Sequence, residues 1–252
     1  MIRILTLNVN AGFDVTRRRF QLPSLRDAVH SVGADIVLLQ EVLGRHAGHA
    51  LRHAQWPAQP QHEYLAHTLW PHHAYGRNAV FTEGEQGNAL LSRFAITGLD
   101  NRDISIAGHE PRGLLHAQLA VPDGELHVIC THLGLLESHR RHQLQSLRRV
   151  VEQHVPADAP LIVAGDFNDW RTRGHDMLLD AGLQEAFHVA HGRLARTFPA
   201  RRPILPLDRI YFRNATVCSA SVLSSRPWSH LSDHAGLLAD LALSMRNERT
   251  GT

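Results

Sequence analysis

The stretch Ala164-Gly165-Asp166-Phe167-Asn168-Asp169 decides how the rest of the chain is interpreted. It follows the apolar run Leu161-Ile162-Val163, which predicts a buried strand bounded by a proline before it and a glycine after it. A strand that ends in carboxylate and amide side chains places polar groups where α/β proteins locate their chemistry. The pattern therefore predicts an active site at residues 166–169. Ordinary turn chemistry is the alternative, because Asp and Asn also bond to their own backbone in loops.

A strand, a helix and a second strand are expected in the first forty residues. Residues 2–9 predict a strand whose polar end is Asn8. Residues 23–32 have apolar side chains at helical spacing, with a proline near the start and a glycine just past the end. The apolar run over residues 35–40 then predicts a strand that leads to Glu41.

The second half of the chain repeats this order of elements. Residues 126–130 predict a strand that ends at Thr131-His132, and residues 143–155 form an amphipathic pattern that leads to the strand before Asp166. With the usual right-handed crossover in each unit, the polar strand ends lie together at one edge of the sheet. We therefore expect five polar side chains to meet there: Asn8, Glu41, His132, Asp166 and Asn168.

Length and composition indicate a globular protein with an ordinary core. The chain has 252 residues, of which 43% are hydrophobic and 20% charged, enough for one large domain or two small ones. No apolar run approaches the ~20 residues that a membrane span needs, and the first strand begins almost at once. We expect a mature, soluble, cytoplasmic monomer without a membrane span.

The basic residues exclude some functions and leave others open. All 26 are arginine, so no lysine can act as a nucleophile or form a Schiff base, and the net charge of +2 excludes a histone-like basic field. The arginine clusters are typical of solvated faces, but a nucleic-acid groove stays open. They lie at residues 17–19, 140–141, 148–149 and 201–202.

Cysteine and histidine give weaker signals. Cys130 and Cys218 lie in β-type runs, which favours buried free thiols in a reducing compartment, although a bridge between them stays open. The pairs His46/His49 and His72/His73 lack the further ligands that a tetrahedral zinc site needs. We interpret these four as loop histidines.

A β-rich region separates the two repeated units. Short strands are expected over residues 78–82, 88–92 and 114–121, with turns at residues 83–87 and 122–124. They extend a sheet with antiparallel members. Arg77 precedes the first of these strands, and either holds a phosphate or closes a turn.

The last third of the chain contributes a further loop and two strands. After a short helix near residues 176–181, residues 197–206 form a proline-rich loop with an apolar tip flanked by arginines. This loop either lines a substrate pocket or packs on the surface. Asp208 stands at the start of the next strand, and Asp233-His234 precedes the final one.

Seven motifs resemble, in order, those of the endonuclease/exonuclease/phosphatase superfamily: Leu7-Asn8, Leu39-Gln40-Glu41, Gly87-Asn88-Ala89-Leu90-Leu91-Ser92-Arg93, Thr131-His132-Leu133, Gly165-Asp166-Phe167-Asn168, Leu207-Asp208-Arg209-Ile210 and Ser232-Asp233-His234. The resemblance runs from residue 2 to about residue 242. It implies an α/β fold, a four-layer α/β/β/α sandwich of two packed mixed sheets with helices outside. It also implies one domain over residues 1–243, a tail over residues 244–252, and a small stand-alone bacterial hydrolase of phosphoester bonds.

The resemblance also implies a divalent metal. A phosphodiester is an anion that repels hydroxide, so a hard cation with oxygen ligands, Mg²⁺ or Mn²⁺, neutralises charge and polarises the phosphoryl oxygen. Glu41 is the expected ligand, assisted by Asn8 and Asp233.

By the same resemblance, Asp166 orients or deprotonates the attacking water while Asn168 contacts the phosphate. His234, paired with Asp208, is the second polarising group, because the carboxylate favours an imidazolium near the developing charge. His132 donates to a phosphate oxygen or to the leaving group. The group that protonates the leaving oxygen stays open.

The substrate stays open among several classes. Asn10 stands where the abasic-site nucleases of the superfamily usually have Asp, and Asp208-Arg209-Ile210 is more similar to deoxyribonucleases, inositol-phosphate phosphatases and tyrosyl-DNA phosphodiesterases. We expect a nuclease or phosphodiesterase acting on nucleic acid. A sphingomyelinase-like lipid or inositol-phosphate phosphohydrolase is the alternative, which the apolar tip Ile204-Leu205 favours. A non-catalytic binding module is disfavoured, because the expected site residues are all present.

Overall fold

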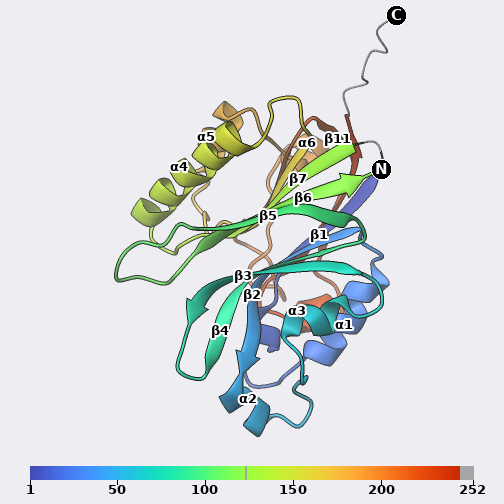
Figure 1. The fold of residues 1–252 in the computed structure, drawn as a ribbon, viewed down its shortest axis with the longest axis vertical. Helices are drawn as coiled ribbons and strands as arrows, with labels where there is room; N and C mark the ends of the chain where they lie inside the picture. The colour runs from blue at the N-terminus through green and yellow to red at the C-terminus, as the bar shows by residue number, and fades with distance from the viewer. Residues whose placement is uncertain (123, 245–252) are drawn as a thin grey trace, which may run out of the picture.

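The computed structural model describes residues 1–122 and 124–244, which form two mixed sheets (Figure 1). The first sheet contains β1 (Ile2–Asn8), β2 (Ile36–His46), β3 (His72–Val80), β4 (Gly84–Ser92), β11 (Ala215–Leu223) and β12 (Gly236–Leu243), in the order β11-β12-β1-β2-β4-β3. The second contains β5 (Ala95–Asp103), β6 (Gly113–Val121), β7 (Gly124–His132), β8 (Leu161–Asp166), β9 (Gln184–Glu185) and β10 (Asp208–Arg213), in the order β5-β6-β7-β8-β10-β9.

The two sheets have the same pattern of strand pairing, which confirms the predicted repetition. Each is centred on a parallel pair, β1 with β2 in the first sheet and β7 with β8 in the second. On both sides of each pair the neighbours are antiparallel: β12 and β4 in the first sheet, β6 and β10 in the second. The predicted strand–helix–strand units therefore form the middle of two separate sheets.

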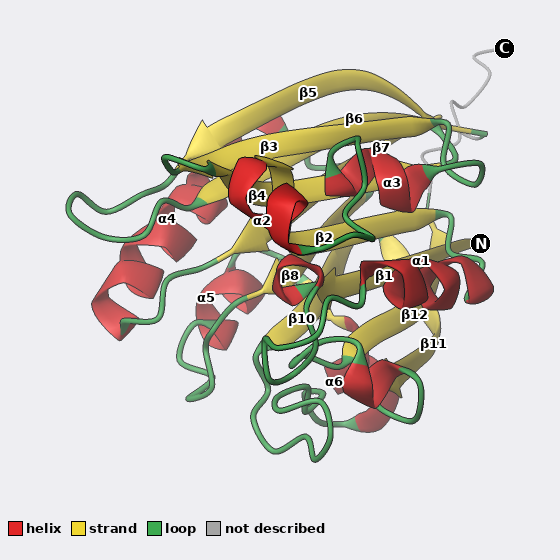
Figure 2. Cartoon of the chain, turned by 90° about the horizontal axis from the view of Figure 1, so that it is seen from below, coloured by secondary structure: helices red, strands yellow, loops and turns green. Residues whose placement is uncertain are grey.

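Helices cover the outer faces of the two sheets and complete four layers (Figure 2). Side chains of α1 (Leu22–Ser31) and α3 (Gln61–Ala66) pack on the first sheet, and those of α4 (Glu137–His154) and α5 (His175–Asp180) on the second. A third apolar cluster fills the space between the sheets. The predicted α/β/β/α sandwich is confirmed.

This layering explains why the central strands appear in the sequence as apolar runs. Ile4 of β1 points into the layer between the sheets, while its neighbour Leu5 packs under the helices. Ile162 and Val163 divide in the same way in β8. Both faces of each central strand are buried, so polar and apolar residues do not alternate along them.

Several predicted boundaries were wrong. The helix predicted from residue 143 begins at Glu137, because its first two turns are polar and conceal the periodicity. Most of the turn predicted at residues 83–87 belongs to β4, and the hairpin closes where Phe81 N donates to Gly84 O at 2.7 Å. The edge strand β5 was not predicted, because most of its side chains are exposed and polar.

The interpretation of four histidines as loop residues was also wrong. His46 ends β2, and its ring caps the short helix α2 (Ala47–Arg52) by accepting from His49 N. His72 and His73 begin β3. Neither pair belongs to a group of possible metal ligands in the described part of the chain.

The two cysteines are free thiols with different surroundings. Cys130 is buried in β7 as predicted, whereas Cys218 on β11 is exposed, so the prediction of burial fails for the second thiol. None of the described helices has both the length and the apolar character needed to cross a bilayer. The predicted tail, residues 244–252, lies outside the described residues except for Ser244.

Candidate functional site

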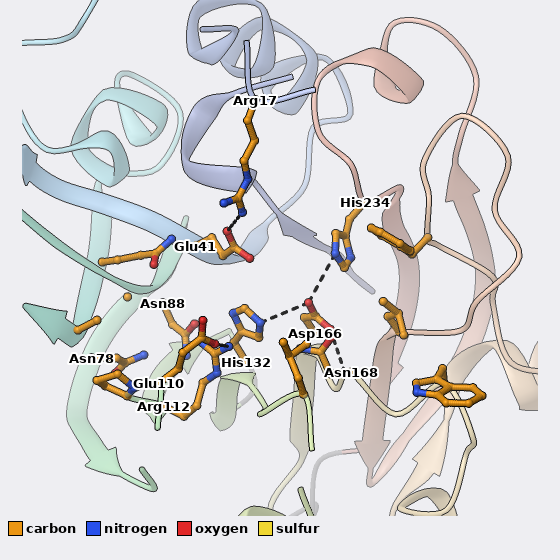
Figure 3. A pocket seen from close by; sticks show the side chains of 18 of the residues that line it. Arg17, Glu41, Asn78, Asn88, Glu110, Arg112, His132, Asp166, Asn168 and His234 are labelled. Atoms are coloured by element: carbon orange, nitrogen blue, oxygen red, sulfur yellow. Dashed lines mark hydrogen bonds and ion pairs between the residues drawn. The ribbon is translucent and has the colours of Figure 1, made fainter. Parts of the chain in front are cut away.

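A cavity of about 500 Å³ opens where the parallel pairs of both sheets end (Figure 3). Its lining includes Glu41 from the first sheet and His132 and Asp166 from the second. Asn8 joins the two sheets behind this lining, because its side-chain amide donates to Glu41 Oε1 and to Asp166 Oδ2, each at 3.1 Å. The predicted meeting of polar strand ends is therefore present, although it forms between two sheets rather than along one.

Glu41 reaches the cavity through an irregularity in β2. The register of β2 on β4 shifts between Leu39 and Val42, and Glu41 in this shift has a φ of 56°. Such a bulge changes the direction of one side chain, which then departs from the regular alternation of the strand. A left-handed conformation costs a residue other than glycine roughly 1–3 kcal/mol, and such strain is concentrated at functional sites.

Asp166 and Asn168 show that turn chemistry and a polar site are compatible. Asp166 Oδ1 accepts from Asn168 N at 2.9 Å, an ordinary Asx turn, while Oδ2 accepts from Asn8. Asn168 has a φ of 51°, which asparagine tolerates, and its amide donates to Leu133 O at 2.9 Å. The turn chemistry considered for this stretch is therefore present, and the active site predicted there stays a prediction.

Gly165 is required by the close approach of β8 to β7. A Cβ atom at this position would lie 1.9 Å from the carbonyl oxygen of Thr131, and the φ of 147° is one that L-residues rarely adopt. Only glycine lets the backbone deliver Asp166 to its place beside His132.

His234 and Asp208 form the predicted pair. His234 Nδ1 lies 2.8 Å from Asp208 Oδ2, and Nε2 lies 3.7 Å from Asp166 Oδ2. The ring of Phe198 packs against the imidazole, with 5.1 Å between centroids. Burial lowers the pKa of His234, but the carboxylates of Asp208 and Asp166 outweigh it and raise the pKa to about 10. His234 is therefore an imidazolium at neutral pH.

Two further groups have shifted pKa values. Burial raises the pKa of Asp166, the His234 imidazolium lowers it and Asp208 raises it again, which leaves a value of about 7. Burial, together with the nearby charges of Arg112 and His234, holds the pKa of His132 well below its usual range. His132 is therefore neutral, with Nε2 3.5 Å from Asp166 Oδ2.

The donor set fits a hard divalent cation. Ligand atoms of Asp166, Asp208 and His234 lie within 4.8 Å of one another, and Asp208 Oδ1 is buried without a hydrogen-bond partner in the described residues. Because the His234 imidazolium has no lone pair to offer a cation, the carboxylate oxygens are the candidate ligands in this group. The cavity lining contains Asp166 and also Glu41, the carboxylate expected from the sequence to be the ligand. Carboxylate and amide oxygens are the ligands that Mg²⁺ and Mn²⁺ prefer.

Four of the predicted residues are not part of the cavity lining: Asn8 and Asp208, whose side chains bond to lining residues, and Arg77 and Asp233. The Arg77 guanidinium is exposed and pairs with Glu85 at 3.4 Å. Asp233 accepts from Ser232 Oγ at 3.3 Å, and its charge contributes to the raised pKa of His234.

The sequence interpretation missed several residues that line the cavity. Arg17, Glu110 and Arg112 are among them, and the proline-rich loop contributes Phe198 and Leu205 as one of its two alternatives foresaw. Arg112 stands directly before β6, and a position before a strand was the available signal. The prediction that Arg77 precedes a strand was wrong, because Arg77 lies within β3.

Comparison with known proteins gives a consistent picture. Residues 5–234 match the model of the endonuclease/exonuclease/phosphatase family. The chain is 50% identical over 244 residues to the Escherichia coli K12 protein named "Uncharacterized protein YbhP", and the match covers 96% of each chain.

Two solved structures share the fold at lower identity. D. rerio TDP2, complexed with a single-strand DNA product, superposes with a TM-score of 0.71 at 18% identity, covering 95% of this chain and 98% of that one. The mannosyl-6-phosphatase Bt3783 of Bacteroides thetaiotaomicron gives a TM-score of 0.72 at 18% identity, covering 96% and 100%. At these identities the likeness concerns the fold, which confirms the expected architecture.

Proposed function

The chain belongs to the endonuclease/exonuclease/phosphatase family, and from this premise we propose that it is a divalent-metal-dependent phosphoester hydrolase acting on nucleic acid. Members of this family are phosphoester hydrolases. The observation that supports the proposal most is one pocket in which the His234–Asp208 pair, at 2.8 Å, faces Asp166, with Glu41 also in the lining.

In this proposal Glu41 and Asn8 hold Mg²⁺ or Mn²⁺, and a contribution from Asp233 stays a prediction. When bound, the cation supplies charge neutralisation and polarisation of a phosphoryl oxygen. Asn8 already donates to Glu41 Oε1, so its amide nitrogen fixes the carboxylate while its oxygen accepts from Asn10 N at 3.0 Å.

The remaining roles follow from charge and position. Asp166 orients the attacking water and accepts its proton through Oδ2, the oxygen nearest both imidazoles. His234, held as an imidazolium by Asp208, donates from Nε2 to the phosphoryl oxygen that gains charge in the transition state. Neutral His132 and the free amide hydrogen of Asn168 donate to the same phosphoryl group.

Nucleic acid is the favoured substrate because guanidinium groups and aromatic rings share the cavity lining. Arg17 and Arg112 suit phosphates, while the rings of Phe81 and Trp170, 52% and 46% exposed, offer faces on which unpaired bases stack. The DNA-bound TDP2 structure agrees with this choice. The likeness to the mannosyl-6-phosphatase does not favour nucleic acid, because the same fold accommodates more than one substrate class.

A lipid or inositol-phosphate substrate remains the second candidate. It is supported by Ile204, which is 56% exposed at the tip of the loop that also supplies Leu205 to the cavity. A non-catalytic module is disfavoured, because burying an imidazolium between two carboxylates costs free energy and such groups are typical of functional sites.

A substrate panel tests the proposal. We expect hydrolysis of DNA or RNA and of a chromogenic phosphodiester with Mg²⁺ or Mn²⁺, and loss of this activity in Glu41→Ala and His234→Ala variants that stay folded by circular dichroism. The panel includes abasic, plain and 5′-tyrosyl DNA, RNA, inositol phosphates and sphingomyelin. Full activity in excess chelator contradicts the metal requirement, and preference for sphingomyelin or inositol phosphates selects the second candidate.

A further inference from the structure

Arg112 occupies a fixed position at the edge of the cavity. Its backbone N–H donates to Ser105 Oγ at 2.9 Å, and its carbonyl accepts from Ile104 N at 3.0 Å, just before β6 begins. The side chain is only 12% exposed, and it lines the cavity together with His132. Figure 3 shows Arg112 and Glu110 on the same side of the cavity as His132.

The guanidinium of Arg112 is not used to hold the fold together. Two other deeply buried arginines, Arg140 and Arg209, donate to backbone carbonyls of neighbouring segments. In the described part of the chain, Arg112 instead has only the carboxylate of Glu110, two residues away, as a side-chain hydrogen-bond partner. Its Nε has no acceptor among those residues, which is also true of Arg140 and Arg209. Five N–H donors with a single neighbouring carboxylate leave this group under-used for a structural role.

Glu110 is a partner that can leave. Its side chain is 67% exposed, so it can exchange Arg112 for water at little cost. A phosphoryl group presents two or more anionic oxygens, which match the planar guanidinium in charge and spacing better than an exposed carboxylate does. Arg17 is the other arginine in the lining. Its guanidinium donates to Glu41 at 3.1 Å and to Asn10 at 2.7 Å, so it is already paired with residues of the site itself.

We propose that Arg112 is a substrate-binding residue that takes a non-bridging oxygen of the phosphoryl group, and that Glu110 is the resting partner displaced when the substrate binds. The assignment rests on the proposed function, since it deepens the description of the same cavity. Arg112 and His132 line the same cavity, and His132 Nε2 lies 3.5 Å from Asp166 Oδ2. The phosphoryl group would therefore lie between Arg112 and the His234–Asp166 pair.

Binding of inorganic phosphate, measured by titration calorimetry with the protein in Mg²⁺, tests this assignment without turnover. We expect Arg112→Ala to weaken phosphate binding roughly tenfold or more, because a hydrogen-bonded charge is lost. Arg112→Lys should retain part of the affinity. Glu110→Gln should do the opposite and strengthen binding about threefold, because the competing carboxylate is neutralised. The same order is expected in kcat/KM for a chromogenic phosphodiester.

Matched controls come from an exposed pair on the outer helix. Arg148 and Glu152 of α4 lie 2.6 Å apart and do not line the cavity, so Arg148→Ala and Glu152→Gln make the same charge changes elsewhere. Both should leave phosphate affinity unchanged. Thermal melts of all variants report whether each one is folded.

Each outcome decides between the alternatives. Unchanged phosphate affinity in folded Arg112→Ala overturns the assignment, and should that variant fail to fold, Arg112→Lys and Glu110→Gln decide in its place. Weaker binding in Glu110→Gln would overturn displacement and make Glu110 a positioning residue. If the wild-type protein binds phosphate through Arg112 yet hydrolyses no phosphoester in the panel, the proposed function fails while the binding assignment stands. Absence of any phosphate binding by the wild-type protein overturns the binding assignment, and the substrate panel then decides the proposed function by itself.

Discussion

Glu41 combines a proposed role as a cation ligand with a backbone conformation that is unfavourable for folding. Its φ of 56° is one that glycine adopts without strain. The carboxylate nevertheless stands there, in a bulge that turns it towards Asn8 and the cavity. A residue kept in a strained conformation is typical of a functional site.

Two substitutions at Glu41 separate these effects. Both Glu41→Gly and Glu41→Ala should abolish phosphodiester hydrolysis, since each removes the carboxylate. Glu41→Gly should be more stable than Glu41→Ala by roughly 1 kcal/mol, because only the alanine retains the left-handed strain. Urea denaturation of the two variants measures the difference. Equal stabilities would show that the bulge relaxes once the carboxylate is gone.

Asp208 is predicted to act through His234. Its carboxylate accepts from Nδ1 at 2.8 Å and helps to hold the pKa of the imidazole at about 10. Asp208→Asn should therefore lower kcat about a hundredfold or more, because the imidazole loses both its orientation and its positive charge. Steady-state rates at neutral pH test this. A variant within a few-fold of the wild-type rate would mean that the pair has no catalytic importance.

At the scale of elements, a buried ionic network holds the two loops that follow β7 and β8. Asp169 accepts from Arg209 Nη1 at 3.3 Å and from Gly174 N at 2.8 Å, and Arg140 Nε lies 4.0 Å away. Arg140 also donates to the carbonyl of Gly134. The loops that present Leu135, Asn168 and Trp170 to the cavity thus share one anchor.

Asp169→Asn should be strongly destabilising. It removes the nearest counter-charge of two buried guanidinium groups, a change that costs about 3–5 kcal/mol. Chemical denaturation measures this loss, and Glu152→Gln in the exposed pair on α4 should cost less than about 1 kcal/mol by comparison. Similar losses in both variants would show that the network is open to water.

Glu185 gives a pH-dependent test at a single helix end. It is buried at the start of α6 (Ala186–His191), where its Oε2 accepts from His188 N at 2.7 Å. Burial raises the pKa of Glu185 to about 7, despite that hydrogen bond. Because the folded state raises the pKa above the unfolded value, this residue stabilises the fold most at acid pH, and the contribution is lost as pH rises through about 7.

Glu185→Gln should therefore flatten the pH dependence of stability. A glutamine can still cap the helix and never ionises, so relative to wild type the variant should gain on the order of 3 kcal/mol between pH 4 and pH 8. Urea denaturation at the two pH values gives the comparison. A constant difference between variant and wild type would show that Glu185 keeps an ordinary pKa.

At the scale of the whole molecule, the site exists because two sheets with the same strand pattern pack face to face. Asn8 and Glu41 come from the parallel pair of one sheet, and His132 and Asp166 from the parallel pair of the other. The hydrogen bond from Asn8 to Asp166 crosses between them. A cation held in this cavity would link the two sheets.

Metal binding should therefore stabilise the whole molecule. A ligand that binds only the folded state at a hundred times its Kd adds about 2.7 kcal/mol to the free energy of unfolding. We expect the melting temperature to rise with Mg²⁺, to return to its starting value with chelator, and to respond far less in Glu41→Ala. A wild-type melting temperature that is insensitive to both Mg²⁺ and Mn²⁺ would count against the cation site.

Much of this arrangement could be predicted from local pattern. Apolar runs and turn residues predict the strand ends at Asn8 and Asp166 and the helix that begins near Pro23. These signals can be recognised in the local sequence, without knowing what each segment packs against. Errors arose where packing overrides pattern. The first turns of α4 are polar yet helical, and β5 is a strand because β6 lies beside it, not because its own side chains alternate.

The sequence by itself determined the repeated strand–helix–strand units, and with them the set of polar strand ends that would meet, because hydrophobic periodicity and chain direction fix these locally. Only the tertiary structure decided that the two units occupy separate sheets, that Arg112 rather than Arg77 lines the cavity, and that Asp169 turns inward to Arg209. These outcomes depend on which faces pack together and which charges burial brings into contact. Such contacts join residues that are far apart in the chain, so the local sequence pattern around each residue cannot predict them.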